Sequence, residues 1–183
     1  MLKRRKSRPI EEQTIQRLFI ACETLNERIL LSLLINTGLR RSDLAQLRQD
    51  SFNLTDRLLI IAEQQKTKEP IFLPLPDQLI ADLKIYLKSL DSKIWLFPSP
   101  YDEKKHIATT TINNMLKKIV VKAQVHNITP HDFRATFLTR AGKAGIPPKL
   151  IIEALGISYK TVMRYYQFFT LEEQREAFNK IQT

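Results

Sequence analysis

The sequence predicts a mainly α-helical domain with a small antiparallel β-sheet, an α+β fold in which helices dominate. Two observations favour this fold class. Apolar residues recur at helical spacing through most of the chain, whereas only two short runs, 58–61 and 71–73, are typical of strands. With 183 residues, 43% of them hydrophobic, the chain is long enough to bury one core, so we expect a single folded unit.

The N-terminal part is predicted to hold two helices. Four apolar residues have the i, i+3, i+4, i+7 spacing of one helical face: Ile15, Leu18, Phe19 and Cys22. This spacing predicts an amphipathic helix over about residues 11–25. A second helix, over roughly 27–37, is expected to end at Gly38, because glycine readily adopts the left-handed conformation at a helix C-terminus.

Two strands are predicted to follow these helices. The two apolar runs are joined by a polar segment, Glu63 to Glu69, that is typical of a turn between paired strands. Pro70 and Pro74 flank the second run, and proline cannot donate to a sheet ladder, so this run is expected to be a short edge strand. From Asp77 onward the pattern returns to helix.

Helices are also predicted throughout the C-terminal half. A threonine cluster at 109–111 can cap the helix that follows it. Thr129 and Pro130 supply a cap and a first-turn proline for the next helix, which Gly142 and Gly145 are expected to end. Three more helices are predicted beyond it: Pro147 to Gly156, about 159–169 and about 171–181.

The balance of charge favours a polyanionic partner. The chain has 29 Lys and Arg against 19 Asp and Glu, a formal net charge of +10. Both a nucleic-acid-binding protein and a merely soluble basic protein are compatible with this value. Residues 1–9, with the basic run Lys3 to Lys6, are expected to form a solvated arm in front of the folded unit 10–183. Near DNA this arm would add salt-sensitive attraction to phosphates.

No feature predicts export or membrane insertion. The basic start leads into Pro9 and a polar helix, not into the apolar stretch of a signal peptide. The longest apolar run, Ile29 to Ile35, is too short to span a bilayer. The one cysteine, Cys22, cannot form an internal disulfide, so we expect a core residue in a soluble, cytoplasmic protein.

Several kinds of catalytic apparatus are missing from the sequence. Three scattered histidines and one cysteine give no metal-ligand spacing such as H-x-x-x-H or C-x-x-C. There is no G-x-x-x-x-G-K-[ST] loop for ATP, no G-x-G-x-x-G for a dinucleotide and no G-x-S-x-G around a serine nucleophile. We therefore expect neither a metal nor another cofactor.

One ordered set of residues can carry chemistry on a phosphodiester: Arg40, Lys66, His131, Arg134 and the adjacent Tyr165 and Tyr166. Two guanidinium groups can hold the non-bridging oxygens and neutralise the charge that grows in a pentacoordinate transition state. A lysine can protonate the leaving 5′ oxygen, and a histidine can hydrogen-bond the phosphate or manage the proton of the nucleophile. Tyrosine, with an ordinary pKa of about 10, needs such help to attack.

Each member of this set, taken alone, also has a plain structural explanation. Arg40 could be a surface arginine beyond a helix stop, and H-x-x-R at a helix start is typical of a capped, solvated turn. Lys66 could be one more lysine of a polar turn, and Tyr165 and Tyr166 could be core aromatics. The order of all the pieces along one chain favours the catalytic interpretation.

Separate stretches of the chain carry a family resemblance, in this order: Asn36 to Leu44 with Leu47 beyond it, Gln65 to Lys68 leading to Leu73-Pro74-Leu75, Trp95 to Pro98, Ile128 to Phe137, Glu153 to Gly156, and Met163 to Tyr166. From about residue 10 to 170 the sequence resembles the catalytic domain of the tyrosine recombinases, the phage-integrase-type site-specific recombinases. The resemblance implies a mainly helical fold with a small sheet that carries Lys66, and a site on one basic face.

By this resemblance Arg40 and Arg134 bind the phosphate. Lys66 is then the lysine of the hairpin, and His131 is the histidine of the second box. Asp43 matches an acidic position after the first arginine, where the resemblance implies that it orients the site.

Two positions depart from the family pattern. The family normally has His or Trp immediately after the Leu-Gly pair, and here Ile157 has no group that can hydrogen-bond a phosphate. The identity of the nucleophile stays open. Counting from Leu155-Gly156 without a gap selects Tyr166, whereas the run Thr161 to Tyr165 matches the family pattern if one residue has been lost. The local pattern favours Tyr165.

The activity that the resemblance implies is site-specific recombination. Tyrosine attacks double-stranded DNA and leaves a 3′-phosphotyrosyl link and a free 5′ hydroxyl. A partner strand's hydroxyl then reverses the bond without metal or ATP, in a tetramer on DNA. Because members usually carry an additional N-terminal DNA-clamping domain, we expect an excised catalytic domain or a short enzyme similar to the inversion recombinases. A non-cleaving DNA-binding protein of the same fold, motivated by Ile157, and a type IB topoisomerase are the alternatives.

Overall fold

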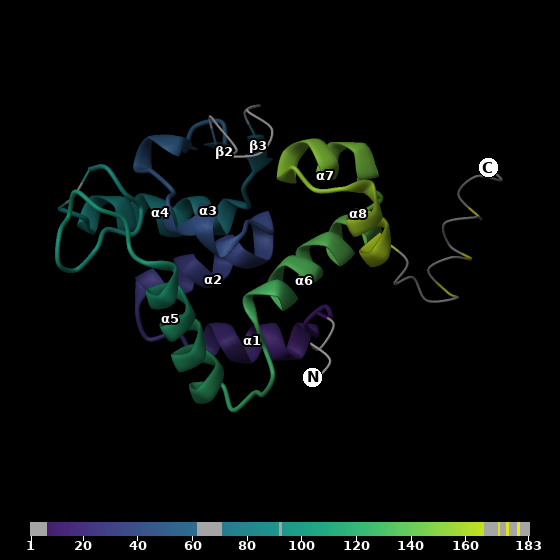
Figure 1. Cartoon of the computed structure of the whole chain (residues 1–183), viewed down its shortest axis with the longest axis horizontal. Helices are drawn as coiled ribbons and strands as arrows, with labels where there is room; N and C mark the ends of the chain where they lie inside the picture. Colours follow the sequence, from purple (N-terminus) through teal and green to yellow (C-terminus); the bar gives the residue numbers. More distant parts are fainter. Residues whose placement is uncertain are drawn as a thin grey trace, which may run out of the picture.

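The computed structural model of the chain describes residues 7–61, 71–91 and 93–166, with the isolated residues 172, 175 and 179. The helices have these bounds: α1 Glu12–Ile20, α2 Leu25–Thr37, α3 Arg41–Ala45, α4 Asp77–Ser89, α5 Thr109–Lys122, α6 Pro130–Lys143, α7 Pro148–Leu155 and α8 Tyr159–Tyr166. The strands are β1 Phe52–Asn53, β2 Leu58–Ile61 and β3 Ile71–Pro74, and a 3₁₀ helix, η1 Gln49–Ser51, precedes β1. The mainly α-helical fold with a small antiparallel sheet is confirmed (Figure 1). The predicted helix at 171–181 lies outside the described residues, apart from the isolated ones.

Helix α2 lies at the centre of the fold. It packs against α4, α5 and α6, and every residue from 29 to 35 is buried (Figure 1). A helix that other helices surround must be apolar on all sides, which explains why the longest apolar run of the sequence lies here. None of the described helices is long and apolar enough to cross a membrane.

The sheet is antiparallel and has the order β1-β2-β3. β3 is an edge strand, as its flanking prolines predicted, and its last residue, Pro74, lies opposite Leu58 of β2. Strand β1, which pairs Phe52 with Leu59, was not predicted, because two residues are too few to show strand periodicity. The predicted turn at 63–69 lies outside the described residues.

The helix predicted over 11–25 ends earlier in the structure than the prediction placed its end. α1 ends at Ile20, and α2 begins after Thr24, whose side chain accepts a hydrogen bond from the N–H of Glu27 at 3.1 Å. The Glu27 carboxylate in turn accepts from the N–H of Thr24, so a capping box separates the two helices. Cys22 lies in the link and is half-buried against the core, and burial raises the pKa of its thiol to about 11.

Two helix ends in the C-terminal half also differ from the prediction. α5 begins after Ala108, so the threonines at 109–111 form its first turn and do not cap it. Gly142 does not end α6 but lies buried inside it, because the helix continues to Lys143 and packs against α8 at this point. Gly145 follows the end of α6 with a φ of +72°. α7 ends as predicted at a left-handed glycine.

The chain before α1 is attached to α6 by two hydrogen bonds. The N–H of Arg8 donates to the carboxylate of Asp132 at 2.9 Å, and the N–H of Ile10 donates to the hydroxyl of Thr136 at 2.8 Å. Asp132 is 2% exposed and also accepts from the backbone N–H and the hydroxyl of Thr129, both at 2.7 Å. The end of the predicted basic arm is therefore bound through its backbone. The start of α6, which carries the H-x-x-R motif, is fixed from two sides.

Replacing Arg8 by proline should destabilise the fold, whereas replacing it by alanine should not. Arg8→Pro removes an N–H from the buried carboxylate of Asp132, which costs about 1–3 kcal/mol. Proline is compatible with this position, because a residue that precedes a proline, here Pro9, favours extended backbone. Arg8→Ala removes the same charge and keeps the N–H. Urea unfolding followed by circular dichroism measures both variants, and equal midpoints would contradict the assigned role of this hydrogen bond.

A tight turn after α2 brings the end of this helix against α6. Gly38 has a left-handed backbone with a φ of +60°, as predicted. The hydroxyl of Thr37 donates to the carbonyl of Leu33 at 2.6 Å and accepts from the N–H of Leu39 at 3.3 Å, which fixes the turn. A Cβ atom added to Gly38 would lie 2.6 Å from Cδ1 of Phe137 on α6. A glycine is therefore required where the turn meets α6.

Gly38→Ala should destabilise the protein more than Gly145→Ala. Both glycines have positive φ, and a left-handed alanine costs roughly 1–2 kcal/mol. A Cβ at Gly145 meets no atom within 4 Å, whereas a Cβ at Gly38 meets Phe137 and adds an overpacking cost of roughly 1–3 kcal/mol. Guanidinium unfolding of the two variants gives the difference. A loss for Gly38→Ala no larger than that for Gly145→Ala would show that Phe137 moves aside freely.

Candidate active site

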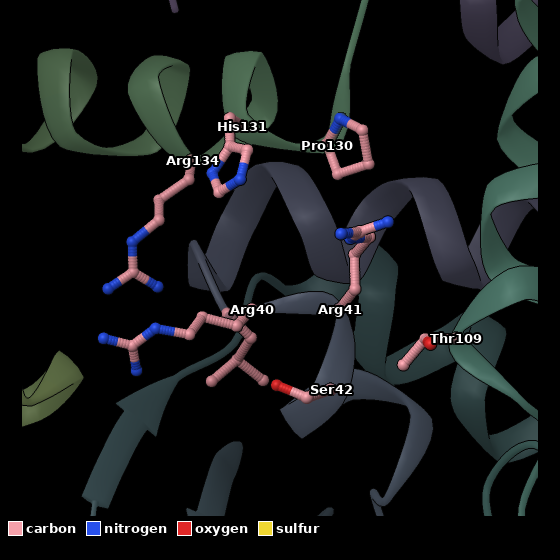
Figure 2. Close-up of a pocket in the computed structure, with 8 residues that line it drawn as sticks. Arg40, Arg41, Ser42, Thr109, Pro130, His131 and Arg134 are labelled. Carbon is pink, nitrogen blue, oxygen red and sulfur yellow. The ribbon is translucent and has the colours of Figure 1, made fainter. Parts of the chain in front are cut away.

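Two arginines from distant parts of the chain lie next to each other. Arg40 follows the turn at Gly38 and immediately precedes α3, whereas Arg134 lies in the second turn of α6. The packing of α2 against α6 brings these segments together. Figure 2 shows the two guanidinium groups beside each other and pointing the same way.

Arg134 is a buried cation with incomplete hydrogen bonding. Its Nη1 donates to the carbonyl oxygen of Gly38, across the contact between α6 and the end of α2. Its Nη2 is buried and has no hydrogen-bond partner among the described residues. A buried donor without a partner is rare in folded proteins and costs about 1–3 kcal/mol. The fold therefore keeps a donor available for an acceptor that binds beside α6.

The surroundings of Arg134 disfavour its positive charge. Burial, and after it repulsion from Arg40, lower the pKa of Arg134 to about 10. Asp43 and the ionised form of Tyr165 act in the opposite direction. An anion held between Arg40 and Arg134 would remove the repulsion and supply the missing acceptor.

Asp43 is close to Arg40. Its Oδ2 lies 3.9 Å from Nη1 of Arg40, and its Oδ1 accepts a hydrogen bond from the hydroxyl of Ser42 at 3.1 Å. The side chains of the ion pair are 40% and 33% exposed, so solvent screens their attraction and the pair adds little stability. The orienting role of Asp43 stays a prediction.

A cavity of about 300 Å³ opens beside the two arginines (Figure 2). Arg40, His131 and Arg134 line it, so the structure brings three of the predicted site residues together. Five further residues complete the lining: Leu39, Arg41, Ser42, Thr109 and Pro130. Arg41 follows Arg40 directly, and this doubled arginine was the signal in the sequence that could have identified it. No local signal could have identified Thr109, because only the packing of α3 against α5 places it there.

The two adjacent tyrosines of α8 have different surroundings. Tyr166 donates its hydroxyl to the carbonyl of Ile146 at 2.7 Å, and its ring packs against Gly142 of α6. Burial raises the pKa of Tyr166, which disfavours its phenolate. Tyr165 is near enough to Arg134 for its ionised form to raise the pKa of that arginine. Neither tyrosine is among the residues that line the cavity.

Ile157 and Lys66 do not contribute to the described part of this site. Ile157 is 8% exposed and belongs to the hydrophobic core. It follows Gly156, which ends α7 in a left-handed conformation. Lys66 lies within residues 62–70, outside the described residues, so its place beside the arginines stays a prediction.

The arrangement of donors is suited to a phosphate oxyanion. Guanidinium groups, an imidazole and hydroxyls surround the cavity, and none of the described carboxylates lines it. Within the described part of the chain, no group of three or more His, Cys, Asp or Glu side chains is arranged to hold a metal ion. The arginine side chains that line the cavity can hold a phosphodiester directly.

Comparison with known proteins places this chain in a family. Residues 8–171 match the sequence profile of the Phage integrase family. The chain belongs to the phage integrase family. It is 31% identical over 156 residues to the tyrosine recombinase XerA of Thermococcus kodakarensis, covering 84% of this chain. A tyrosine recombinase of Thermosipho africanus is 29% identical over 158 residues, covering 86% of this chain. The resemblance inferred from the sequence is confirmed.

Solved structures of phage integrase relatives have the same fold. The crystal structure of XerA recombinase matches 99% of this chain with a TM-score of 0.79 and 24% identity. The Tn1549 transposon integrase, in complex with transposon right end DNA, matches 100% of this chain with a TM-score of 0.77 and 18% identity. At these identities the likeness shows the fold alone. The chain spans 55% and 54% of the lengths of the Thermococcus and Thermosipho relatives.

Inorganic phosphate should stabilise this integrase-family domain by binding between Arg40 and Arg134. For a Kd of about 10 mM, about 100 mM phosphate adds roughly 1.4 kcal/mol, which raises Tm by roughly 3–6 °C. The Tm is measured against chloride at equal ionic strength. Phosphate also stabilises proteins generally, so Arg40→Gln should retain only that general part. Arg28→Gln, at the other end of α2, is the control that should keep the full shift, and an equal shift in all three proteins would contradict specific binding.

Proposed function

We propose that this chain is the catalytic part of a tyrosine recombinase that cleaves and rejoins double-stranded DNA through a 3′-phosphotyrosyl intermediate. The observation that carries the proposal is the buried Arg134, whose Nη2 has no partner among the described residues and which lies beside Arg40. A fold keeps such a pair of cations together at a cost in stability, and a bound phosphodiester offsets that cost. Membership of the family and the net charge of +10 support DNA as the substrate.

Cleavage in this proposal is an in-line displacement at phosphorus. The phenolic oxygen of the tyrosine attacks the scissile phosphate, and the bond from phosphorus to the 5′ oxygen breaks. Arg40 and Arg134 hold the non-bridging oxygens, where negative charge grows in the transition state. His131, in the wall of the cavity, hydrogen-bonds the phosphate or takes the phenolic proton, and Lys66 gives a proton to the leaving 5′ oxygen.

Rejoining reverses the same steps. The 5′ hydroxyl of a partner strand attacks the phosphorus of the phosphotyrosyl link, the tyrosine oxygen leaves, and it regains its proton. One phosphodiester bond is broken and one is formed, so the bond energy is conserved through the covalent intermediate. The reaction requires no ATP and no metal ion in this mechanism, because the two guanidinium groups supply the positive charge.

We assign the nucleophile to Tyr165. Its electrostatic coupling to Arg134 supports this assignment, since a nucleophile must reach the phosphate that the arginines hold. Tyr166 has a structural task in this proposal, because its hydroxyl is bonded to Ile146 and its ring is packed on Gly142. The raised pKa of Tyr166 also makes it the weaker candidate.

Tyr165→Phe should abolish the covalent DNA adduct, whereas Tyr166→Phe should retain it. Each protein is incubated in EDTA with labelled DNA from the flanks of its own gene, denatured in SDS, and examined for a shifted band. Tyr165→Phe should still bind DNA, because the arginines remain. Tyr166→Phe should lose about 1 kcal/mol of stability with its hydrogen bond to Ile146. An adduct that persists in Tyr165→Phe and disappears in Tyr166→Phe would overturn the assignment.

A second function is favoured by one observation. Ile157 supplies no hydrogen-bond donor where the family pattern has His or Trp, and its side chain is buried in the core. A DNA-binding protein that keeps the fold without cleaving would bind the same DNA and form no adduct with any flank. Cleavage sites can be missed when the true target is absent, so the full set of flanking fragments must be tested before this alternative is accepted.

The proposed partners are double-stranded DNA and further copies of the chain. In the complete recombination reaction two duplexes exchange strands, so we propose that a tetramer assembles on DNA. The chain spans 55% of the length of its Thermococcus relative, and the Tn1549 transposon integrase has been solved in complex with transposon right end DNA. A chain that lacks the additional residues of the Thermococcus relative should bind DNA weakly and with strong salt dependence.

A further inference from the structure

The cavity beside the arginines is lined by two separate groups of donors. Arg40 and Arg134 point to one side of His131, and the side chain of Arg41 lies on the other side, toward Pro130 (Figure 2). Ser42 and Thr109 also line the cavity, and Figure 2 shows Thr109 on the side of Arg41, whereas the Ser42 hydroxyl donates to Asp43. The proposed scissile phosphate occupies only the first group of donors. The second group has no task in the mechanism described above.

Arg41 is held in place by a neutral partner. Its Nη1 donates to Oδ1 of Asn113 on α5 at 2.7 Å, and its side chain is half-buried. Asn113 is one helical turn after Thr109, so both residues present the same face of α5 to α3. The bond to Asn113 orients the guanidinium group and leaves its other donors without a hydrogen-bond partner among the described residues.

The charge of Arg41 is not neutralised within the described part of the chain. Arg40 has Asp43 at 3.9 Å, whereas Arg41 has an amide as its hydrogen-bond partner and no ion pair among the described residues. Among the residues that the structure describes, no carboxylate lines the cavity. An oriented guanidinium without an ion pair, in a cavity that a threonine also lines, is suited to bind an anionic oxygen.

We propose that Arg41, with Thr109, binds a second phosphate of the cleaved strand, the one adjacent to the phosphate held by Arg40 and Arg134. This inference rests on the proposed function, because the first phosphate sets the position of the strand. A DNA strand presents a phosphate about every 3.4 Å along the helix axis, so a strand that enters this cavity brings a neighbouring phosphate with it. The contact fixes the register of the strand against the nucleophile without reading bases.

Salt dependence of DNA binding tests this subsite independently of cleavage. Arg41→Gln removes the charge, and the glutamine can still hydrogen-bond Asn113. Each phosphate contact contributes about 0.9 to the slope of log Kobs against log salt, so the slope should become shallower by about 0.9. Binding of a labelled 30-base-pair duplex, measured by anisotropy between about 50 and 200 mM salt, gives this slope.

Arg28→Gln is the matched control for this measurement. Arg28 forms an ion pair with Asp82 at 3.0 Å and lies near the start of α2, about 15 Å along the helix from Gly38. The Arg28→Gln variant removes the same charge from the protein and should leave the slope of log Kobs against log salt unchanged. If Arg41→Gln and Arg28→Gln give the same slope, the subsite does not exist and Arg41 only joins α3 to α5.

The variant Asn113→Ala distinguishes a structural role of Arg41 from a role in phosphate binding. This variant removes the bond between α3 and α5 and keeps the guanidinium charge. Its slope should stay within a few tenths of the wild-type slope, whereas Arg41→Gln loses the full contact. Arg41→Lys replaces the guanidinium by an ammonium group of the same charge and should retain most of the wild-type slope. This variant is the second measurement if Arg41→Gln folds poorly. Loss of slope in Asn113→Ala equal to that in Arg41→Gln would overturn the proposal.

Uncharged phosphate analogues in the DNA substrate identify the phosphate that Arg41 contacts. Once an adduct locates the cleaved bond, a methylphosphonate is placed at the neighbouring phosphate on either side. At one of these positions the wild-type rate of adduct formation should fall about tenfold, as expected when a charge-assisted hydrogen bond is lost. Arg41→Gln should cleave unmodified DNA about tenfold more slowly and show no further loss with that substrate. Losses that multiply to about a hundredfold would contradict the contact.

The failure of this inference can be told from the failure of the proposed function. A shallower slope for Arg41→Gln, with no adduct in the wild type, supports the phosphate subsite and removes the recombinase mechanism. An adduct in the wild type with an unchanged slope for Arg41→Gln keeps the mechanism and removes the subsite.

Discussion

Arg134 donates a hydrogen bond from α6 to the carbonyl of Gly38 at the end of α2, and this bond joins the two segments that carry the paired arginines. Gly38 can accept it because its left-handed turn ends α2 against Phe137, where no larger residue fits. Arg40 is placed two residues beyond this turn. The geometry of the site therefore follows from how one helix ends on another, and α6 is held at this contact by the capped start at Asp132.

The same contact creates a conflict between stability and binding. Arg134 is buried, is repelled by Arg40, and has one donor without a partner in the described structure. Each of these features disfavours the folded state without a ligand, and each is relieved by an anion. The core around α2 is apolar and continuous, so the fold can tolerate this local cost. Strain that has no structural benefit is a physical reason to treat the arginine pair as a functional site.

The sequence predicted those helix ends and caps that depend on a few neighbouring residues. The glycine that ends α2 and the cap that begins α6 were correctly placed, because each depends on backbone preferences at one position. The capping box at Thr24 and Glu27 was overlooked, since the apolar spacing around it continued through the break. Gly142 was assigned to a helix end, but its lack of a side chain allows the ring of Tyr166 to pack against α6. Arg41 and Thr109 meet only through tertiary packing, which no local pattern contains.

Packing distinguishes two adjacent tyrosines that residue spacing in the sequence could not distinguish as candidates for the nucleophile. Neighbouring residues of a helix point about 100° apart, so fixing one side chain sets the direction of the next. The ring of Tyr166 packs against Gly142 of α6, and its hydroxyl donates to the carbonyl of Ile146 in the loop between α6 and α7. α8 is thereby held against the helix that carries Arg134, and Tyr165 comes within electrostatic reach of that arginine. Tyr166 is a half-buried anchor, and Tyr165 is coupled to the arginine. This difference is a physical basis for giving a structural role to one tyrosine and a chemical role to the other.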